Sequence, residues 1–273
     1  MELEVRKRRA QLYRYQGVGA GICILAAFYL FYMVWEIDSD FIRWKFGIGS
    51  SALITVSICI VYALLVAIAC LIMRLGSIKI AEILATECDP FLYEACIQKN
   101  SRLLYKDRLL CSLALAQHYQ GNFDRAWETL QGINVYKLHG IHRANYYILM
   151  SDQYFKRGMG QQVRELEERY RQSVKTKNKR EWKYFETLCA GNNLTRALEN
   201  QDYQAAAGFL GERIALNGNA SRPWTRVIFA LKEAQIYLGL GEKESARLCL
   251  KYVVENGNRM WCVQEALRLS ERI

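Results

Sequence analysis

The chain has 273 residues, with 37 lysines and arginines against 27 aspartates and glutamates, and a formal net charge of +10 at pH 7. Its nine cysteines are an odd number without a Cys-x-x-Cys pair, which argues against a disulfide framework or a zinc site and favours a reducing compartment. Only two prolines occur, and no strand-like alternation follows residue 74, so the composition favours an all-α fold.

Two uncharged apolar segments lie near the start of the chain, over residues 17–35 and 49–73. About 20 apolar residues in a helix span the ~30 Å hydrocarbon core of a bilayer, where the backbone must satisfy its own hydrogen bonds. We therefore expect a two-helix transmembrane hairpin over residues 17–73, with the lipid bilayer as a partner. The alternatives are a cleaved signal peptide, which the second segment argues against, and buried core helices, which rarely stay uncharged for this length.

Basic residues flank the hairpin unevenly. Five precede it, at Arg6, Lys7, Arg8, Arg9 and Arg14, whereas the connector over 36–48 carries only Arg43 and Lys45. Basic residues near helix ends stay in the cytoplasm. The sequence thus predicts a two-pass cell-membrane protein with a basic cytoplasmic N-terminus over 1–16 and a cytoplasmic C-terminal domain.

The first apolar segment contains a motif that is common at helix contacts in membranes. Gly17 and Gly21 form a Gly-x-x-x-Gly pair, and small residues allow helices to approach closely in lipid. We expect this pair at a helix contact, the alternative being the general abundance of glycine in membrane helices. Residues 74–88 are expected to extend the second helix or to form a short linker.

The pattern of the remaining sequence predicts paired helices. Asp89 before Pro90 predicts a capped helix over 91–100, and residues 259–272 predict a closing helix. Four segments between them share one shape, in which a helix ends at a turn and a second helix follows: 113–130, 148–170, 193–214 and 230–253. The turns fall at Gly121, Gly158, Gln201 and Gly241.

Small and apolar residues recur at fixed places in these segments. The small positions hold Ala114, Ser151 and Ala234 on the first helices and Ala126, Ala206 and Ala246 on the second, and a later apolar position holds Leu130, Leu210 and Leu250. This pattern resembles the tetratricopeptide repeat (TPR) family. Leu194, Val163 and Glu167 depart from it, the family's early tryptophan and closing proline are missing, and the turns lie 37, 43 and 40 residues apart against 34 in a regular array.

The resemblance implies a TPR-like α-solenoid of helix pairs over 89–273 that binds a protein partner. The family's concave face would carry a mixed polar set suited to a polar peptide, the alternative being solvent-facing side chains: Arg108, His118, Tyr119, Asn145, Asp152, Lys156 and Gln235. The scaffold itself does not identify the partner, because many unrelated proteins use it.

A basic patch lies between the second and third helix pairs. It contains Arg169, Arg171, Lys175, Lys177, Lys179, Arg180 and Lys183. A solvated loop is the first interpretation, and contact with anionic lipid headgroups is the second, because each basic residue near a negative leaflet contributes about 1 kcal/mol. We do not expect nucleic acid as a partner, and an acidic protein is a further alternative.

The sequence contains few residue patterns that indicate catalysis. His139 and His142 lie three residues apart, but no neighbouring ligand completes a metal spacing, and no nucleotide or hydrolase motif occurs. We expect no catalytic residue, no metal site and no cofactor. The sequence favours a membrane-anchored cytoplasmic scaffold or assembly subunit for protein–protein interaction. The alternatives are an accessory or regulatory subunit of a membrane transporter or enzyme that acts through the hairpin, and a membrane-bound enzyme with an unrecognised site.

Overall fold

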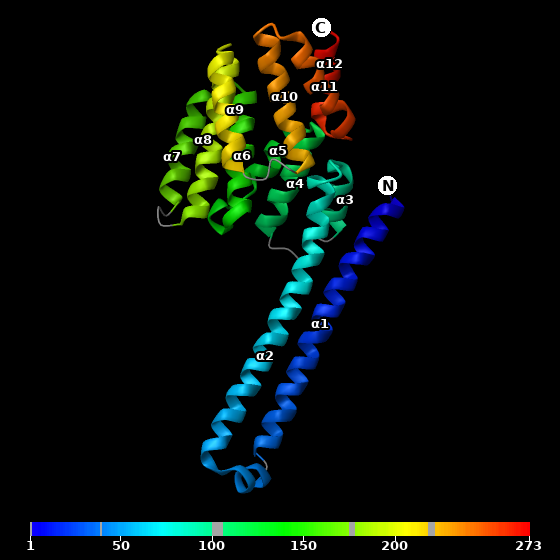
Figure 1. Ribbon diagram of the computed structural model, residues 1–273, viewed down its shortest axis with the longest axis vertical. Helices are drawn as coiled ribbons and strands as arrows, with labels where there is room; N and C mark the ends of the chain where they lie inside the picture. The colour runs from blue at the N-terminus through cyan, green and yellow to red at the C-terminus, as the bar shows by residue number, and fades with distance from the viewer. Residues whose placement is uncertain (1, 39, 100–105, 175–177, 218–221) are drawn as a thin grey trace. The chain divides into compact units, whose positions relative to one another are not determined.

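The computed structural model describes residues 2–38, 40–99, 106–174, 178–217 and 222–273. Within these ranges the chain forms twelve α-helices and one short 3₁₀ helix, and no strand, which confirms the all-α expectation (Figure 1). The chain divides into two compact units, Met1–Ala81 and Glu82–Ile273.

The first unit is built from two long helices, α1 (Glu2–Asp38) and most of α2 (Asp40–Ala85). The stretches Glu2–Met33 and Val56–Ala85 are long and apolar enough to cross a membrane. Because α1 ends at Asp38 and α2 begins at Asp40, the connector expected over 36–48 is largely helical. Helix α2 also continues through most of the segment 74–88, as far as Ala85.

Glycines allow α1 and α2 to approach, but not the glycines expected from the sequence. A Cβ atom added at Gly19 would lie 2.6 Å from Met73 Cγ, whereas one added at Gly17 or Gly21 would meet nothing within 4 Å. Gly17 and Gly21 therefore do not form the contact between α1 and α2, and their expected role in helix packing stays a prediction. Residues two positions apart lie on nearly opposite faces of a helix, so Gly19 takes the contact face and the pair 17/21 faces away.

The second unit contains the other helices. In chain order they are α3 (Pro90–Lys99), α4 (Lys106–Gln120), α5 (Phe123–Gln131), the 3₁₀ helix η2 (Val135–Lys137), α6 (Gly140–Lys156), α7 (Gly160–Ser173), α8 (Lys179–Glu199), α9 (Tyr203–Asn217), α10 (Pro223–Gly239), α11 (Lys243–Asn256) and α12 (Trp261–Ser270). The start of α3 is as expected, because the Asp89 carboxylate accepts hydrogen bonds from the amides of Phe91 at 3.0 Å and Leu92 at 2.9 Å.

Four turns between successive helices share one backbone geometry. The turn residues expected from the sequence all have positive φ, at 86° for Gly121, 67° for Gly158, 58° for Gln201 and 80° for Gly241. In each turn, the following amide donates to the carbonyl five residues earlier, as from Asn122 to Gln117 at 2.9 Å and from Glu242 to Tyr237 at 2.8 Å. This is the Schellman geometry, which ends a helix with a left-handed residue.

The small positions lie where paired helices touch. Six small side chains are fully buried, each with 0% of its surface exposed: Ala114, Ala126, Ser151, Ala206, Ala234 and Ala246. Leu194 and Val163, which depart from the expected small type, are also fully buried. Helix axes approach to within about 8–10 Å only where such side chains allow it, so these residues set the spacing of each pair.

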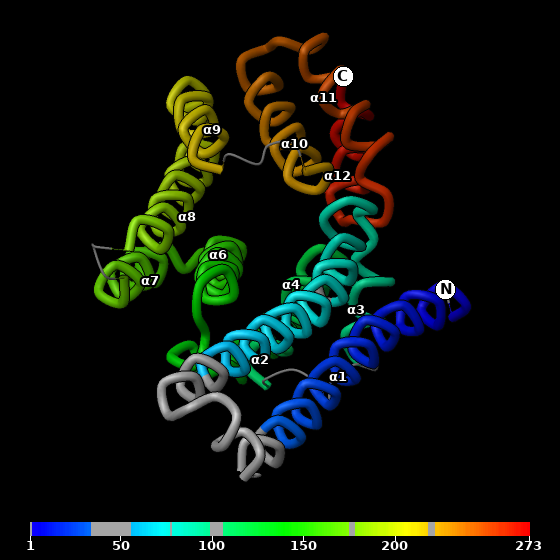
Figure 2. Tube along the Cα trace, turned by 60° about the horizontal axis from the view of Figure 1, so that its bottom comes forward, coloured from blue at the N-terminus to red at the C-terminus, as the bar shows by residue number. Residues whose placement is uncertain are grey.

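The helices of the second unit follow one another around a closed ring. Helix α4 contacts α6, α6 contacts α8, α8 contacts α9, and α9 contacts α10. The last helix, α12, contacts both α10 and α4, and so returns the chain to the start of the unit (Figure 2). The inner sides of α4, α6 and α10 therefore face a shared interior.

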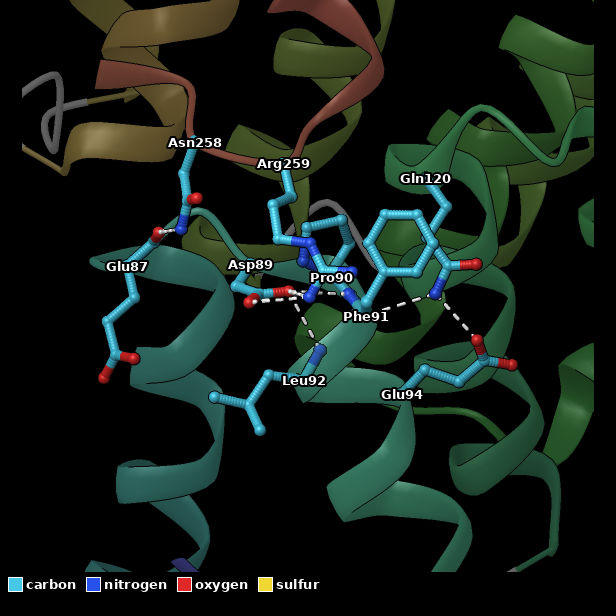
Figure 3. Close-up of polar contacts among 9 residues, drawn as sticks. All are labelled: Glu87, Asp89, Pro90, Phe91, Leu92, Glu94, Gln120, Asn258 and Arg259. Atoms are coloured by element: carbon cyan, nitrogen blue, oxygen red, sulfur yellow. Dashed lines mark hydrogen bonds and ion pairs between the residues drawn. The ribbon is translucent and has the colours of Figure 1, made fainter. Parts of the chain in front are cut away.

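A polar clasp joins the two ends of this ring. We define it as Glu87, Asp89, Phe91, Asn258 and Arg259 (Figure 3). The Asn258 amide donates to the Glu87 carbonyl at 2.7 Å, and Arg259 Nη1 lies 3.3 Å from Asp89 Oδ2. The Arg259 guanidinium also lies 4.4 Å from the centre of the Phe91 ring. The clasp thus holds the turn before α12 against the first turn of α3.

Candidate functional site

Polar and charged side chains from four helices act on one another electrostatically. We call this set the inner cluster, and it contains His118 and Tyr119 of α4, Asp152 and Lys156 of α6, Arg213 of α9 and Lys232 of α10. His118 Nε2 lies 3.7 Å from Asp152 Oδ2. The charge of Asp152 also acts on the pKa values of Tyr119, Lys156 and Lys232, which belong to α4, α6 and α10.

Helical spacing explains the positions of two members, and a glycine on a neighbouring helix explains that of a third. Asp152 and Lys156 lie four residues apart and so share one face of α6. Arg213 packs against the backbone of α8, because Gly191 there leaves room that a side chain would take. A Cβ atom at Gly191 would lie 3.0 Å from the Arg213 guanidinium carbon.

Aromatic rings surround the cluster on the side of α12. Tyr119 makes edge-to-face contacts with His118 at 5.2 Å and with Trp224 at 5.1 Å between ring centres. Phe123 contacts His118 at 5.4 Å and Trp261 at 5.7 Å. These contacts connect the end of α4 to the first turns of α10 and α12, and they hold the polar members in a rigid frame.

Lys156 lies over this aromatic frame. Its Nζ atom is 3.8 Å from the centre of the Phe123 ring and 5.1 Å from the Trp261 ring. A cation over an aromatic face is attracted by about 0.5–1 kcal/mol at an exposed site. The ammonium group is thus held at the edge of the cluster although its side chain is exposed.

Burial changes the protonation of the cluster. Only 4% of His118 is exposed, and burial lowers its pKa, which Lys156 lowers further and Asp152 opposes. Burial also lowers the pKa values of Lys156 and Lys232 and raises that of Tyr119. Burial thus favours the neutral form of His118 and disfavours the charged forms of both lysines.

Several buried polar atoms here have no hydrogen-bond partner among the described residues. Three are donors, namely Arg213 Nε, Trp224 Nε1 and Trp261 Nε1, and the others are His118 Nδ1 and Gln235 Oε1. A buried polar group without a partner costs about 1–3 kcal/mol. Such a group is unusual in a structural core and is typical of a site that binds water or a ligand.

The structure brings together four of the seven residues expected on the concave face. His118, Tyr119, Asp152 and Lys156 belong to the inner cluster, and Gln235 lies three residues after Lys232 on α10. Arg108 lies near the other end of α4, where its charge acts on His142, and Asn145 lies two turns before Asp152.

Two members of the cluster, Lys232 and Arg213, were not predicted from the sequence. Lys232 precedes Gln235 by three residues and so lies on the same side of α10, a signal that could have been used. Arg213 is on the second helix of its pair, where the resemblance indicated no binding position.

The basic patch is exposed at the end of α7 and the start of α8. Arg169, Arg171, Lys179, Arg180 and Lys183 are exposed, and Lys175 and Lys177 lie outside the described residues. Glu181 does not neutralise the patch, because it pairs with Arg143 at 2.6 Å.

Arg169 of the patch also lines a pocket of about 270 Å³. Its other polar and aromatic lining residues include Tyr136, Tyr146, Tyr147 and Ser173. The patch is thus continuous with a tyrosine-lined depression between η2, α6 and α7.

Metal ligands do not gather in the described part of the chain, where no group of three or more histidine, cysteine, aspartate or glutamate side chains could hold an ion. No family model matches this chain, and neither does any curated protein or solved structure.

Proposed function

We propose that the chain is a membrane-anchored interaction subunit. In this proposal α1 and α2 cross the bilayer, and the second unit binds a protein partner through the inner cluster. The observation that carries it is the inner cluster, where His118 Nε2 lies 3.7 Å from Asp152 Oδ2 and Lys156 Nζ lies 3.8 Å from the centre of the Phe123 ring. Next to these groups, His118 Nδ1 is buried without a hydrogen-bond partner among the described residues.

The helix pairs of the second unit are, in this proposal, TPR-like repeats. The four left-handed turns and the buried small positions support it, because they are the features on which the resemblance rests. The contact of α12 with α4 gives these repeats a closed arrangement instead of an open stack. A scaffold or assembly role, without catalysis, follows from such a repeat domain.

The second unit and the N-terminus lie in the cytoplasm in this proposal. The basic residues before α1's apolar stretch support the orientation, and so do the free cysteines, which fit a reducing compartment. Binding of anionic lipid headgroups by the exposed basic patch is part of the same proposal, because each basic residue near a negative leaflet contributes about 1 kcal/mol.

Replacing the hairpin tests this function. The full chain and a chimera with residues 1–73 exchanged for an unrelated two-pass anchor are purified from native membranes in mild detergent, and co-purified proteins are identified. We expect the chimera to keep the same partner and the variant Asp152→Asn/Lys156→Gln to lose it. Lys251→Gln is the matched control, because Lys251 pairs with Glu255 on the exposed surface of α11.

The same experiment separates the alternative. A partner that is lost with the hairpin but kept by the Asp152/Lys156 variant would show that the protein acts through its membrane helices. That result would contradict binding at the inner cluster.

A further inference from the structure

The pocket between η2, α6 and α7 has a single charged side chain in its lining, that of Arg169. We call it the tyrosine pocket, because Tyr136, Tyr146 and Tyr147 line it together with this arginine. The other lining residues are apolar or carry an amide or a hydroxyl group, so no carboxylate is among the described residues that form the pocket. The tyrosine pocket is therefore a cavity of about 270 Å³ with aromatic walls and a positive charge.

The tyrosine pocket has a rigid, buried side and an open side. Tyr147 and Leu166 are only 6% and 2% exposed. Tyr147 stacks on Tyr170 with the ring centres 4.2 Å apart, and Tyr146 meets Tyr147 edge to face at 5.5 Å. Arg169, by contrast, is exposed. A binding partner can thus reach the guanidinium while the aromatic side of the pocket is already packed in place.

Tyr136 is exposed although its backbone is held in place. Of its surface 87% is exposed. Its amide donates to Asn134 Oδ1 at 3.1 Å, and the Asn134 amide donates to Asp107 Oδ1 at 2.8 Å. Leu138, which follows η2, is fully buried. Tyrosine and arginine are the residue types most enriched where proteins bind one another, and here an exposed residue of each type lines one pocket.

The guanidinium of Arg169 forms no ion pair with a carboxylate of the described residues. Its Nε atom donates to the backbone carbonyl of Glu165 at 3.4 Å. The Glu165 carboxylate accepts instead from Gln161 at 3.3 Å. The Glu168 carboxylate accepts from Gln172 at 3.0 Å. The terminal nitrogens of Arg169 can therefore bind two oxygens of one carboxylate from outside the chain, which is the arrangement that a guanidinium favours.

The charge and the size of the tyrosine pocket indicate which group it takes. One guanidinium matches one carboxylate, whereas a headgroup with several phosphates would bring more negative charge than the pocket can neutralise. Sites for whole small molecules measure about 300–1,000 Å³, so this smaller cavity suits a side chain of a partner. Arg169 also belongs to the basic patch, whose other exposed cations would attract further acidic residues of the same partner.

We infer that the tyrosine pocket binds an acidic peptide segment of a partner protein. One side-chain carboxylate of the segment pairs with Arg169, and a neighbouring aromatic side chain packs against Tyr136. The inference goes beyond the proposed function, which assigns partner binding to the inner cluster and lipid binding to the basic patch. Anionic lipid is the competing occupant of the pocket, and the experiment includes it.

The test measures peptide binding to the full chain in micelles of a neutral detergent, by fluorescence anisotropy. The probe is a short labelled peptide in which glutamates flank one phenylalanine, with both ends blocked. One matched peptide carries glutamine in place of glutamate, and another carries glycine in place of phenylalanine. We expect the probe to bind about tenfold more tightly than either matched peptide, because each of these lacks one of the two contacts.

Three variants locate the bound peptide. Arg169→Gln and Tyr136→Ala should each weaken binding by about tenfold, as expected for central residues of an interface. Arg171→Gln is the matched control, because it removes the same charge from α7, but Arg171 does not line the pocket and lies 3.6 Å from Glu168. This control should weaken binding by no more than about twofold. All three side chains are exposed, so the thermal unfolding midpoint should stay at the wild-type value.

The comparison of the two arginine variants decides the inference. Weaker binding by Arg169→Gln and Tyr136→Ala, with binding kept by Arg171→Gln, supports it. Equal losses for Arg169→Gln and Arg171→Gln overturn it, because the peptide would then respond only to the general charge of the patch. Equal binding of the glutamate and glutamine peptides, or full binding by Tyr136→Ala, also overturns it.

A soluble fluorescent phosphatidylserine replaces the peptide in a second series. If this lipid binds in a manner that depends on Arg169 and the peptide does not bind, the pocket is a lipid site and the inference is wrong. Failure of the peptide to bind would leave the co-purification result for Asp152→Asn/Lys156→Gln unaffected, because that variant changes the inner cluster. The two proposals can therefore fail separately.

Discussion

Arg259 lies 170 residues after Asp89 and forms an ion pair with it, Nη1 to Oδ2 at 3.3 Å. The same carboxylate accepts hydrogen bonds from the amides of Phe91 and Leu92 and so caps α3. One side chain therefore begins a helix and holds the distant turn that closes the second unit (Figure 3). Asp89 has two roles and Arg259 has one, so we expect substitutions of the two residues to lower the stability by unequal amounts.

Arg259→Ala should lower the free energy of unfolding by about 1 kcal/mol, because the pair is partly exposed and such pairs contribute little. Asp89→Ala should cost more, about 2 kcal/mol, because it also removes the cap of α3. Urea unfolding of the full chain in mild detergent, followed by tryptophan fluorescence, measures both. The double variant should cost less than the sum, and strictly additive values would show that the two residues do not interact in solution.

Gln201 occupies a turn position that three glycines fill elsewhere. Its φ of 58° lies in the left-handed region, which costs a non-glycine residue about 1 kcal/mol. Gln201→Gly should therefore stabilise the second unit by roughly that amount. Gly241→Ala is the matched opposite change, since its φ is 80° and a Cβ atom there would meet nothing within 4 Å. Gly241→Ala should lower the free energy of unfolding by a similar amount. If neither variant changes the stability, the left-handed backbone at these turns does not strain a non-glycine residue.

Gly19 sets the approach of α1 to α2. Gly19→Leu should disrupt their packing at a cost of about 1–3 kcal/mol, because even a Cβ atom would lie 2.6 Å from Met73 Cγ and 3.0 Å from the Ala69 carbonyl oxygen. Gly17→Leu should leave the packing of α1 against α2 and the stability of the single chain unchanged. Limited proteolysis in micelles and the thermal midpoint compare the two variants, and equal effects would argue against this helix contact.

His118 should make stability depend on pH. Its folded pKa is lowered by burial, so the unfolded chain takes up its proton first as the pH falls through about 6.5. The free energy of unfolding should then decrease below pH ~6.5 and stop decreasing below the folded pKa. The groups around His118 are Asp152, Lys156 and the rings of Tyr119 and Phe123.

His118→Gln isolates this contribution. Its free energy of unfolding should fall less between pH about 7.5 and 5.5 than that of the wild type. His139→Gln, a change at an exposed histidine, should keep the wild-type slope. If the free energy of unfolding depends on pH equally in the wild type and both variants, His118 is not a buried neutral histidine.

Local signals predicted much of this fold. The cap at Asp89 and the left-handed turns follow from residue types with strong backbone preferences, and the structure shows them at the expected positions. The small residues at Ala114, Ala126 and Ala246 likewise indicated where helices touch, because close approach excludes larger side chains.

Contacts between residues far apart in the sequence were not predicted. Nothing local links Arg259 to Asp89 or Trp261 to Phe123, so the return of α12 to α4 could not be read from periodicity. Arg213 was missed for a similar reason, since its place depends on Gly191 of another helix. The contact of Gly19 with α2 was not predicted either, because a Gly-x-x-x-Gly pair does not say which neighbour, if any, it meets.

The clasp also limits how this chain can change in length. An open array of repeats tolerates the gain or loss of a unit, since each unit contacts only its neighbours. Here Arg259 reaches Asp89 only if the intervening helix pairs complete one full circuit. Duplication or deletion of a pair would separate these ends and expose Cys88 and Met260, both now fully or almost fully buried, so the number of pairs is fixed by geometry.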